Sequence, residues 1–192
     1  MPDWNARYAA ASAADAQPAR VLSEFAHLLP SKGRALDLAC GLGANARLLA
    51  RRGLRVDAWD GAAVAIDRLR ELAEREGLDV RTSVRDVLAH PPEPGTFDVI
   101  VVSRFLERTL APALREALRP GGLLYYQTFL REAVDPARGP RRAEYRLGNN
   151  ELLALFPGLR LVAYREEGRL GDPGTGFRDE AYAVFKRACD VE

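Results

Sequence analysis

The chain has 192 residues, 47% of them apolar, and a formal net charge of +1 at pH 7. This length suffices for one well-buried core, so we expect a single domain over residues 1–192. The near-neutral charge disfavours a nucleic-acid partner, and no apolar run reaches the eighteen residues of a membrane span. The N-terminus lacks a basic start followed by an apolar stretch, so we expect a cytoplasmic protein without a membrane partner.

Apolar runs alternate with amphipathic stretches from Arg34 onward, which is typical of βα units around a parallel sheet. One amphipathic stretch ends at Gly77, a glycine that predicts a helix C-cap. Another is expected to run from an N-cap at Thr109 to a turn at Pro120–Gly122. The predicted strands are 35–39, 55–59, 79–83, 97–102 and 123–128.

The last third of the chain has a different pattern. An arginine-rich loop, "DPARGPRRAEYR", precedes a short predicted helix at "NNELLALF". The apolar stretches "LRLVAYRE" and "EAYAVFKRA" are separated by a Gly/Asp/Pro turn region and are expected to pair antiparallel. We therefore expect an N-terminal cap helix region (1–30) laid across the sheet, a cofactor-binding half (34–130) and an acceptor side (131–192). The predicted fold is α/β, a doubly wound and mostly parallel sheet with an antiparallel edge.

A glycine-rich loop follows the first predicted strand. Residues 41–46 read "GLGANA", which fits G-x-G-x-x-G/A between a strand and a helix, and Asp60 ends the next strand. This match alone admits a dinucleotide site, and a turn that needs glycine only for its backbone is the alternative. Asp37, just before the loop, would repel a diphosphate but stabilise an ammonium group. S-adenosylmethionine carries an ammonium group and no phosphate, so the sequence favours it as cofactor.

Acidic residues also follow the next two strands. Asp60 is placed to accept hydrogen bonds from both ribose hydroxyls, and capping of the following helix is its alternative role. Asp86 is placed to accept from the adenine amino group while Val87 packs beside it, and a solvated loop acid is the alternative. Residues 103–105 end a buried strand at the carboxyl edge, where open α/β sheets bind ligands. An acidic residue after each of three successive strands indicates this cofactor far more specifically than the glycine pattern does.

These stretches resemble a known family. "ALDLACGLGANA", "VDAWD", "RDV", "FDVIVVSRFL" and "LRPGGLLYYQTF" resemble, in order and spacing, the motifs of class I S-adenosylmethionine-dependent methyltransferases, over roughly residues 4 to 187. Among them the chain looks most like the small bacterial tellurite-resistance-type methyltransferases, through "WNARYA", Asn45, the Trp59-Asp60 pair and "YREEGRLGDPGTG". That subfamily places a His-Arg pair where this chain has Gly171-Asp172, which puts tellurite in doubt as the acceptor.

The resemblance implies a seven-stranded Rossmann-like sheet with the last strand antiparallel, S-adenosylmethionine as cofactor and S-adenosylhomocysteine as product. It places the methionine part at the glycine loop, the ribose at Asp60 and the adenine at Asp86 and Val87, with Arg7 and Tyr8 closing the pocket. The complete set of predicted cofactor-binding residues is Arg7, Tyr8, Asp37, Ala39, Cys40, Gly41, Gly43, Asn45, Asp60, Gly61, Asp86, Val87, Ser103, Arg104 and Phe105.

Methyl transfer from a sulfonium is an in-line displacement, and a soft nucleophile needs no catalytic base. We assign no catalytic residue and, because Cys40 and Cys189 lack neighbouring ligands, no metal. Candidate acceptor-site residues are Tyr126, Thr128, Phe129, Arg141 and Arg142; core packing of the aromatic residues and a solvated arginine loop are the alternatives. The predicted function is methylation of a small molecule, such as a soft or anionic nucleophile. A non-catalytic S-adenosylmethionine-binding sensor or partner protein and an NAD-dependent oxidoreductase are the alternatives.

Overall fold

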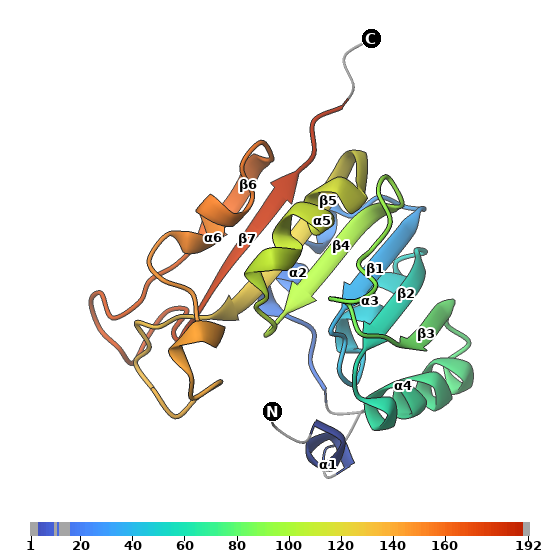
Figure 1. Ribbon diagram of the computed structural model, residues 1–192, viewed down its shortest axis with the longest axis horizontal. Helices are drawn as coiled ribbons and strands as arrows, with labels where there is room; N and C mark the ends of the chain where they lie inside the picture. Colours follow the sequence, from blue (N-terminus) through green and yellow to red (C-terminus); the bar gives the residue numbers. More distant parts are fainter. Residues whose placement is uncertain (1–3, 10, 12–15, 190–192) are drawn as a thin grey trace.

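Seven strands form one sheet in the order β3-β2-β1-β4-β5-β7-β6 in the computed structural model, which describes residues 4–9, 11 and 16–189 (Figure 1). Strands β1 to β5 pair in parallel, and β7 is antiparallel to both of its neighbours. The predicted seven-stranded sheet with an antiparallel last strand is confirmed. The predicted domain limits, 1–192, include ends outside the described residues. The strands are β1 Arg34–Leu38, β2 Arg55–Asp60, β3 Val80–Val84, β4 Phe97–Ser103, β5 Leu118–Phe129, β6 Arg160–Arg165 and β7 Glu180–Lys186.

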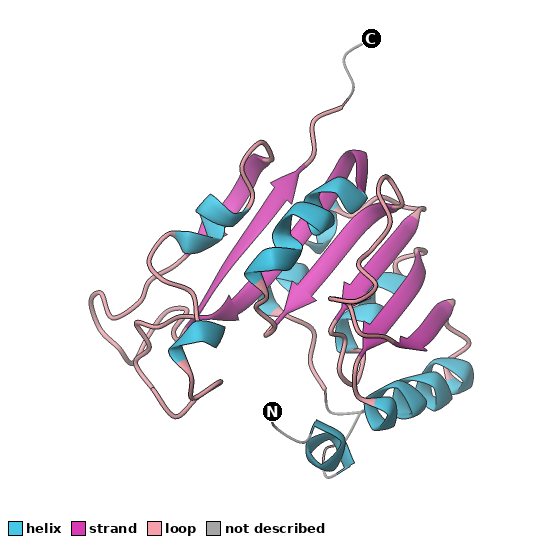
Figure 2. Cartoon of the chain, viewed as in Figure 1, coloured by secondary structure: helices cyan, strands magenta, loops and turns pink. Residues whose placement is uncertain are grey.

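Helices cover both faces of the sheet (Figure 2). One face carries α2, α3 and α4, whose residues Val21, Leu49 and Leu69 share a buried core cluster with the central strands. The opposite face carries α5 and α6, whose residues Leu114 and Leu152 belong to a second cluster. The helices are α1 Trp4–Ala9, α2 Arg20–Glu24, α3 Ala44–Arg51, α4 Ala63–Arg75, α5 Ala111–Ala117 and α6 Glu151–Leu155, with short 3-10 turns at Ala26–Leu28, Arg108–Leu110 and Ala143–Tyr145. Among the described helices, none combines the length and apolarity needed to cross a bilayer.

The central strands are covered on both faces, which explains their continuous apolar sequences. Residues 99–102 of β4 are completely buried, and so are residues 35–38 of β1. Their carboxyl ends open onto the glycine loop and onto Ser103. The sheet therefore presents one edge at which the ends of β1, β2 and β4 lie together.

Three predicted details differ from the structure. Helix α5 begins at Ala111, because the Glu107 side chain caps a preceding 3-10 turn by accepting from the Thr109 N–H. The turn predicted at residues 120–122 lies within β5, at a register shift in its pairing with β4. The N-terminal helix α1 lies beside α4 (Figure 1), and the helix that packs on the sheet near the N-terminus is α2.

Candidate functional site

The glycine loop leaves β1 through three residues with positive φ: Ala39 (55°), Gly41 (51°) and Gly43 (73°). Gly43 is the N-cap of α3, and a β-carbon there would lie 2.2 Å from the Leu69 side chain. At Gly41, a β-carbon would lie 2.9 Å from the Tyr8 hydroxyl. At Gly43, glycine is therefore favoured both by the close approach of the buried Leu69 side chain and by the left-handed backbone. The thiol of Cys40 is buried in the same loop.

Asp37 is completely buried beneath this loop. Its Oδ2 accepts from the Ala46 N–H (2.9 Å), and its Oδ1 accepts from the Asn45 side chain (3.3 Å). The same Asn45 amide donates to Ser103 Oγ (3.0 Å), so it connects the carboxyl ends of β1 and β4. Burial raises the pKa of Asp37 to about 7. In this structure the carboxylate anchors α3 from beneath the loop, and its attraction for an ammonium group stays a prediction.

This raised pKa predicts pH-dependent cofactor binding. Below pH 7 the free protein holds a proton on Asp37, whereas a neighbouring ammonium group favours the ionised carboxylate. Binding then releases a proton, and affinity rises with pH up to the free-state pKa. We expect the Kd for S-adenosylhomocysteine to fall about tenfold from pH 5.5 to 7.0, below the range where an α-amino group loses its proton. Calorimetric titration measures this; Asp37→Asn is expected to give a flat profile, and a flat wild-type profile would contradict the assignment.

Asp60 links the end of β2 to the glycine loop. Its Oδ2 accepts from the Gly41 N–H (2.8 Å), and its Oδ1 accepts from the Ala62 N–H (2.8 Å) at the start of α4. The second contact holds the turn before α4, whose N-cap is Ala62, so Asp60 does not have the alternative capping role. Each carboxylate oxygen retains a second lone pair, so the group can also accept from a ribose hydroxyl. Gly61 is exposed, and a β-carbon there would meet no atom within 4 Å.

Tyr8 is the predicted N-terminal residue that reaches the loop. Its ring packs against Leu42, Ala62 and Ala65. Burial and the negative charge of Asp60 raise the pKa of Tyr8 to about 12, so the hydroxyl remains protonated and available as a donor. Arg7, in contrast, lies with its guanidinium 5.3 Å from the Trp4 ring centroid on the exposed helix.

The residues predicted at the adenine and at the end of β4 have distinct environments. Asp86 is exposed and its Oδ1 accepts from the Leu88 and Ala89 N–H groups, as expected for a loop acid that caps a turn. Val87 is buried in the core cluster that contains Trp59. After β4, Ser103 receives the Asn45 hydrogen bond and Phe105 packs partly against the core.

Sequence reasoning missed a buried polar cluster at the carboxyl ends of β4 and β5. Glu180, the first residue of β7, is 1% exposed and accepts from Gln127 at 2.5 Å. The guanidinium groups of Arg104 and Arg138 each lie 3.4 Å from Glu180 Oε1. Arg104 has a φ of 55°, which directs the chain away from the sheet after β4. The sequence signal that could have revealed this cluster is a polar residue, Gln127, within the apolar stretch "LLYYQTF".

The predicted acceptor residues are not gathered at one point. The Tyr126 hydroxyl donates to the Phe105 carbonyl (3.0 Å), and Phe129 lies beneath Gly139, so both have packing roles. Thr128 Oγ1 is buried without a hydrogen-bond partner among the described residues. Arg141 and Arg142 are both exposed, and Arg142 pairs with Glu144 (3.2 Å).

Arg146 organises the arginine-rich loop. It is 6% exposed and donates to the backbone carbonyls of Leu130, Pro136, Arg138 and Pro140. A guanidinium group with its donors in a planar fork suits this arrangement, which a lysine would not satisfy. The loop is therefore a folded structure built around one buried cation.

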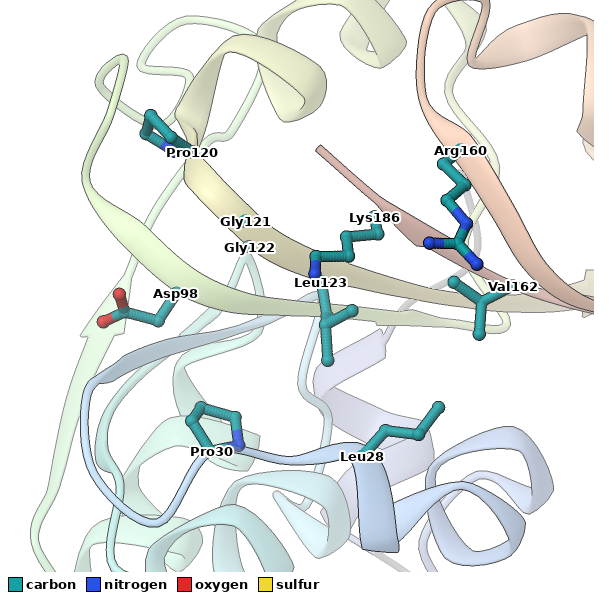
Figure 3. Close-up of a pocket in the computed structure, with 10 residues that line it drawn as sticks. All are labelled: Leu28, Pro30, Asp98, Pro120, Gly121, Gly122, Leu123, Arg160, Val162 and Lys186. Carbon is teal, nitrogen blue, oxygen red and sulfur yellow. The ribbon is translucent and has the colours of Figure 1, made fainter. Parts of the chain in front are cut away.

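A cavity of about 400 Å³ lies elsewhere, at the amino ends of β4 and β6 (Figure 3). Asp98, Arg160 and Lys186 are among its lining residues, and none of the predicted site residues is. Open α/β sheets bind ligands at the carboxyl ends of their strands, so this cavity is not the candidate cofactor site. Within the described part of the chain, no group of three or more His, Cys, Asp or Glu side chains could hold a metal ion.

Comparisons with known proteins identify a family that this chain resembles. A family model described as "Methyltransferase domain" matches residues 35–122. The ubiquinone biosynthesis O-methyltransferase of Methylocella silvestris is 33% identical over 162 residues, covering 74% of this chain and 63% of that protein. The tRNA 5-carboxymethoxyuridine methyltransferase of Escherichia coli K12 is 35% identical over 115 residues, covering 55% of this chain and 42% of that protein.

The third similar protein is TehB of Haemophilus influenzae, a probable S-adenosyl-L-methionine-dependent methyltransferase. It is 29% identical over 140 residues, covering 69% of this chain and 48% of TehB. A crystal structure of Haemophilus influenzae TehB matches with a TM-score of 0.70 and 23% identity, over 86% of this chain and 61% of that one. The chain spans less than two thirds of the length of these relatives. The resemblance stated from the motifs is confirmed: the match to the methyltransferase model and the likeness to TehB both support a class I S-adenosylmethionine-dependent methyltransferase.

Proposed function

We propose that this chain transfers a methyl group from S-adenosylmethionine to a small-molecule acceptor. The observation that carries the proposal is the link between Asp60 and Gly41, which fixes a carboxylate against the turn of the glycine loop. Asp60 would bind the ribose hydroxyls, the loop backbone would hold the methionine part, and Tyr8 would cover them. The buried charge of Asp37 favours a positively charged group above the loop and disfavours the phosphates of a nicotinamide cofactor.

The bound cofactor would supply an electrophilic methyl group on its sulfonium. The chain's own contribution is to hold the acceptor in line with that group and to exclude water. Asn45 fixes the loop and Ser103 relative to each other, which keeps the ends of β1 and β4 in register for this alignment. Tyr126 already donates to a backbone carbonyl, and burial raises its pKa far above neutrality, so it is not suited to act as a general base.

The acceptor is proposed to be a soft or anionic nucleophile. Arg104 and Arg138 are the candidates to contact an anionic group, because both have side chains at least half exposed at the carboxyl edge. Glu180 lies beside both guanidinium groups, and Asp179 lies beside Arg138. The acceptor-site role of Arg141 and Arg142 stays a prediction, and a raised acceptor KM after their replacement by alanine is its test. Cytoplasmic location also stays a prediction.

Methyl transfer from labelled S-adenosylmethionine tests the proposal. The acceptor panel should contain thiols, oxyanions and carboxylates, with transfer RNA as a separate arm because one similar protein is a transfer-RNA methyltransferase. Label in a small-molecule product is the expected result. Label found only in RNA would contradict a small-molecule acceptor. Tight cofactor binding without any methyl transfer would favour the non-catalytic sensor.

A further inference from the structure

Helix α1 is held on the molecule by very little apolar burial. None of its six residues is buried, and the Tyr8 ring is the part that packs against the apolar cluster Leu42, Ala62 and Ala65. A helix of this length is not stable in water by itself. Its position beside α4 must therefore come from specific polar contacts.

Arg68 of α4 supplies such contacts at the C-terminal end of α1. Its guanidinium donates to the carbonyls of Tyr8 (2.8 Å) and Ala9 (2.7 Å), and also to the carbonyl of Ala11. The last carbonyls of a helix have no partner within the helix, and a cation is favourable there. At the other end, Asn5 Oδ1 accepts from the Val64 N–H (3.2 Å). Arg68 thus binds the backbone of the very segment that carries Tyr8.

The position of Tyr8 makes this contact relevant to the cofactor site. Its hydroxyl is the atom nearest to a β-carbon placed on Gly41, and the negative charge of Asp60 contributes to its raised pKa. Tyr8 consequently covers the loop and the carboxylate that the proposed function assigns to the methionine and ribose parts. If α1 separates from α4, this cover is lost while the sheet and the glycine loop remain intact.

We propose that Arg68 is a positioning residue that holds α1 closed over the cofactor, acting through Tyr8. The inference rests on the proposed cofactor site at Asp60 and Gly41. Arg68 would increase the fraction of molecules in which Tyr8 covers the loop, and cofactor affinity falls in proportion to any loss of that fraction.

Titration of S-adenosylhomocysteine into the full chain tests this role. Arg68→Ala and Arg68→Met, the latter keeping an apolar stem, are both expected to raise Kd about tenfold, as a fall of the closed fraction to about one tenth would require. The matched control is Arg70→Ala on the same helix, whose side chain contacts Asp67 and Thr82 instead. It is expected to change Kd less than twofold.

Two readouts separate this role from a merely structural one. In a Tyr8→Ala background, Arg68→Ala should raise Kd no further, because the residue through which it acts is gone. Without ligand, trypsin cleavage after Arg7 should be faster in Arg68→Ala than in the wild type and in Arg70→Ala, and Arg68→Ala should need about tenfold more S-adenosylhomocysteine to slow it.

Unchanged affinity in both Arg68 variants, or an equal tenfold loss in the Tyr8→Ala background, would overturn the inference. Asp60→Ala separates this failure from failure of the proposed function. If Asp60→Ala loses binding while the Arg68 variants keep it, only the positioning role fails. If Asp60→Ala binds as the wild type does, the cofactor site itself is wrong.

Discussion

Asp60→Ala is expected to raise the Kd for S-adenosylhomocysteine at least a hundredfold. The carboxylate would contribute two charge-assisted hydrogen bonds to the ribose, each worth about 1.5–3 kcal/mol, so about 3 kcal/mol is the minimum loss. The substitution also removes the acceptor for the Gly41 N–H, which loosens the glycine loop. Isothermal titration measures the change directly.

Asp60→Asn is the informative companion variant. Its amide retains one oxygen that can accept from a backbone N–H, but it has no negative charge. A loss of affinity almost as large as that of Asp60→Ala would assign the effect to the charge-assisted bonds. Asp67→Ala, an exposed carboxylate on α4 paired with Arg70, is the control and should bind as the wild type does. Wild-type affinity in Asp60→Ala would remove the proposed ribose site.

Gly43→Ala is expected to destabilise the fold by about 3 kcal/mol. A left-handed alanine costs about 1–2 kcal/mol, and overpacking against the Leu69 side chain at 2.2 Å adds about 1–3 kcal/mol. For a chain of this size the midpoint of thermal unfolding should fall by about 6–12 °C. Differential scanning calorimetry without ligand measures this fall.

Gly61→Ala is the matched control for this stability effect. Gly61 lies after β2, and its added β-carbon would meet no atom within 4 Å. Its midpoint should remain within about 2 °C of the wild type. Equal shifts in the two variants would mean that the contact between Gly43 and Leu69 does not constrain the loop.

The sheet and the glycine loop were predictable because their signals are local. Apolar strands such as Phe97–Ser103 stand out in the sequence, and glycines mark a turn wherever the backbone requires positive φ. The pairing of the last strands followed from their apolar runs and the turn between them. Family motifs then gave the cofactor type, which the comparisons confirm.

The contacts of the site were not predictable from local patterns. Asp37 and Asp60 were predicted to contact the cofactor, and the structure adds that both already accept hydrogen bonds from the protein. The sequence does not distinguish Arg138 from the other arginines of the loop "DPARGPRRAEYR". Among the ion pairs of the described residues, Arg138 is the arginine of this loop that approaches Glu180. These partners come from segments far apart in sequence, and only the folded chain brings them together.

The position of α1 depended on the same kind of long-range contact. Its sequence, "WNARYA", has no strong apolar face that would predict where the helix packs, and none of its residues is buried. Arg68 looks like an ordinary polar residue on an amphipathic helix. Its role is visible only once the carbonyls of Tyr8 and Ala9 lie beside it.

Thermal unfolding with S-adenosylhomocysteine and with NADH, in parallel, tests the central assignment most directly. A ligand present at about one hundred times its Kd adds roughly 2.7 kcal/mol of stability, which corresponds to a rise of about 5–10 °C for this chain. We predict this rise with S-adenosylhomocysteine, no rise with NADH, and loss of the rise in Asp60→Ala. A rise with NADH alone would contradict the cofactor assignment and the methyltransferase activity proposed from it.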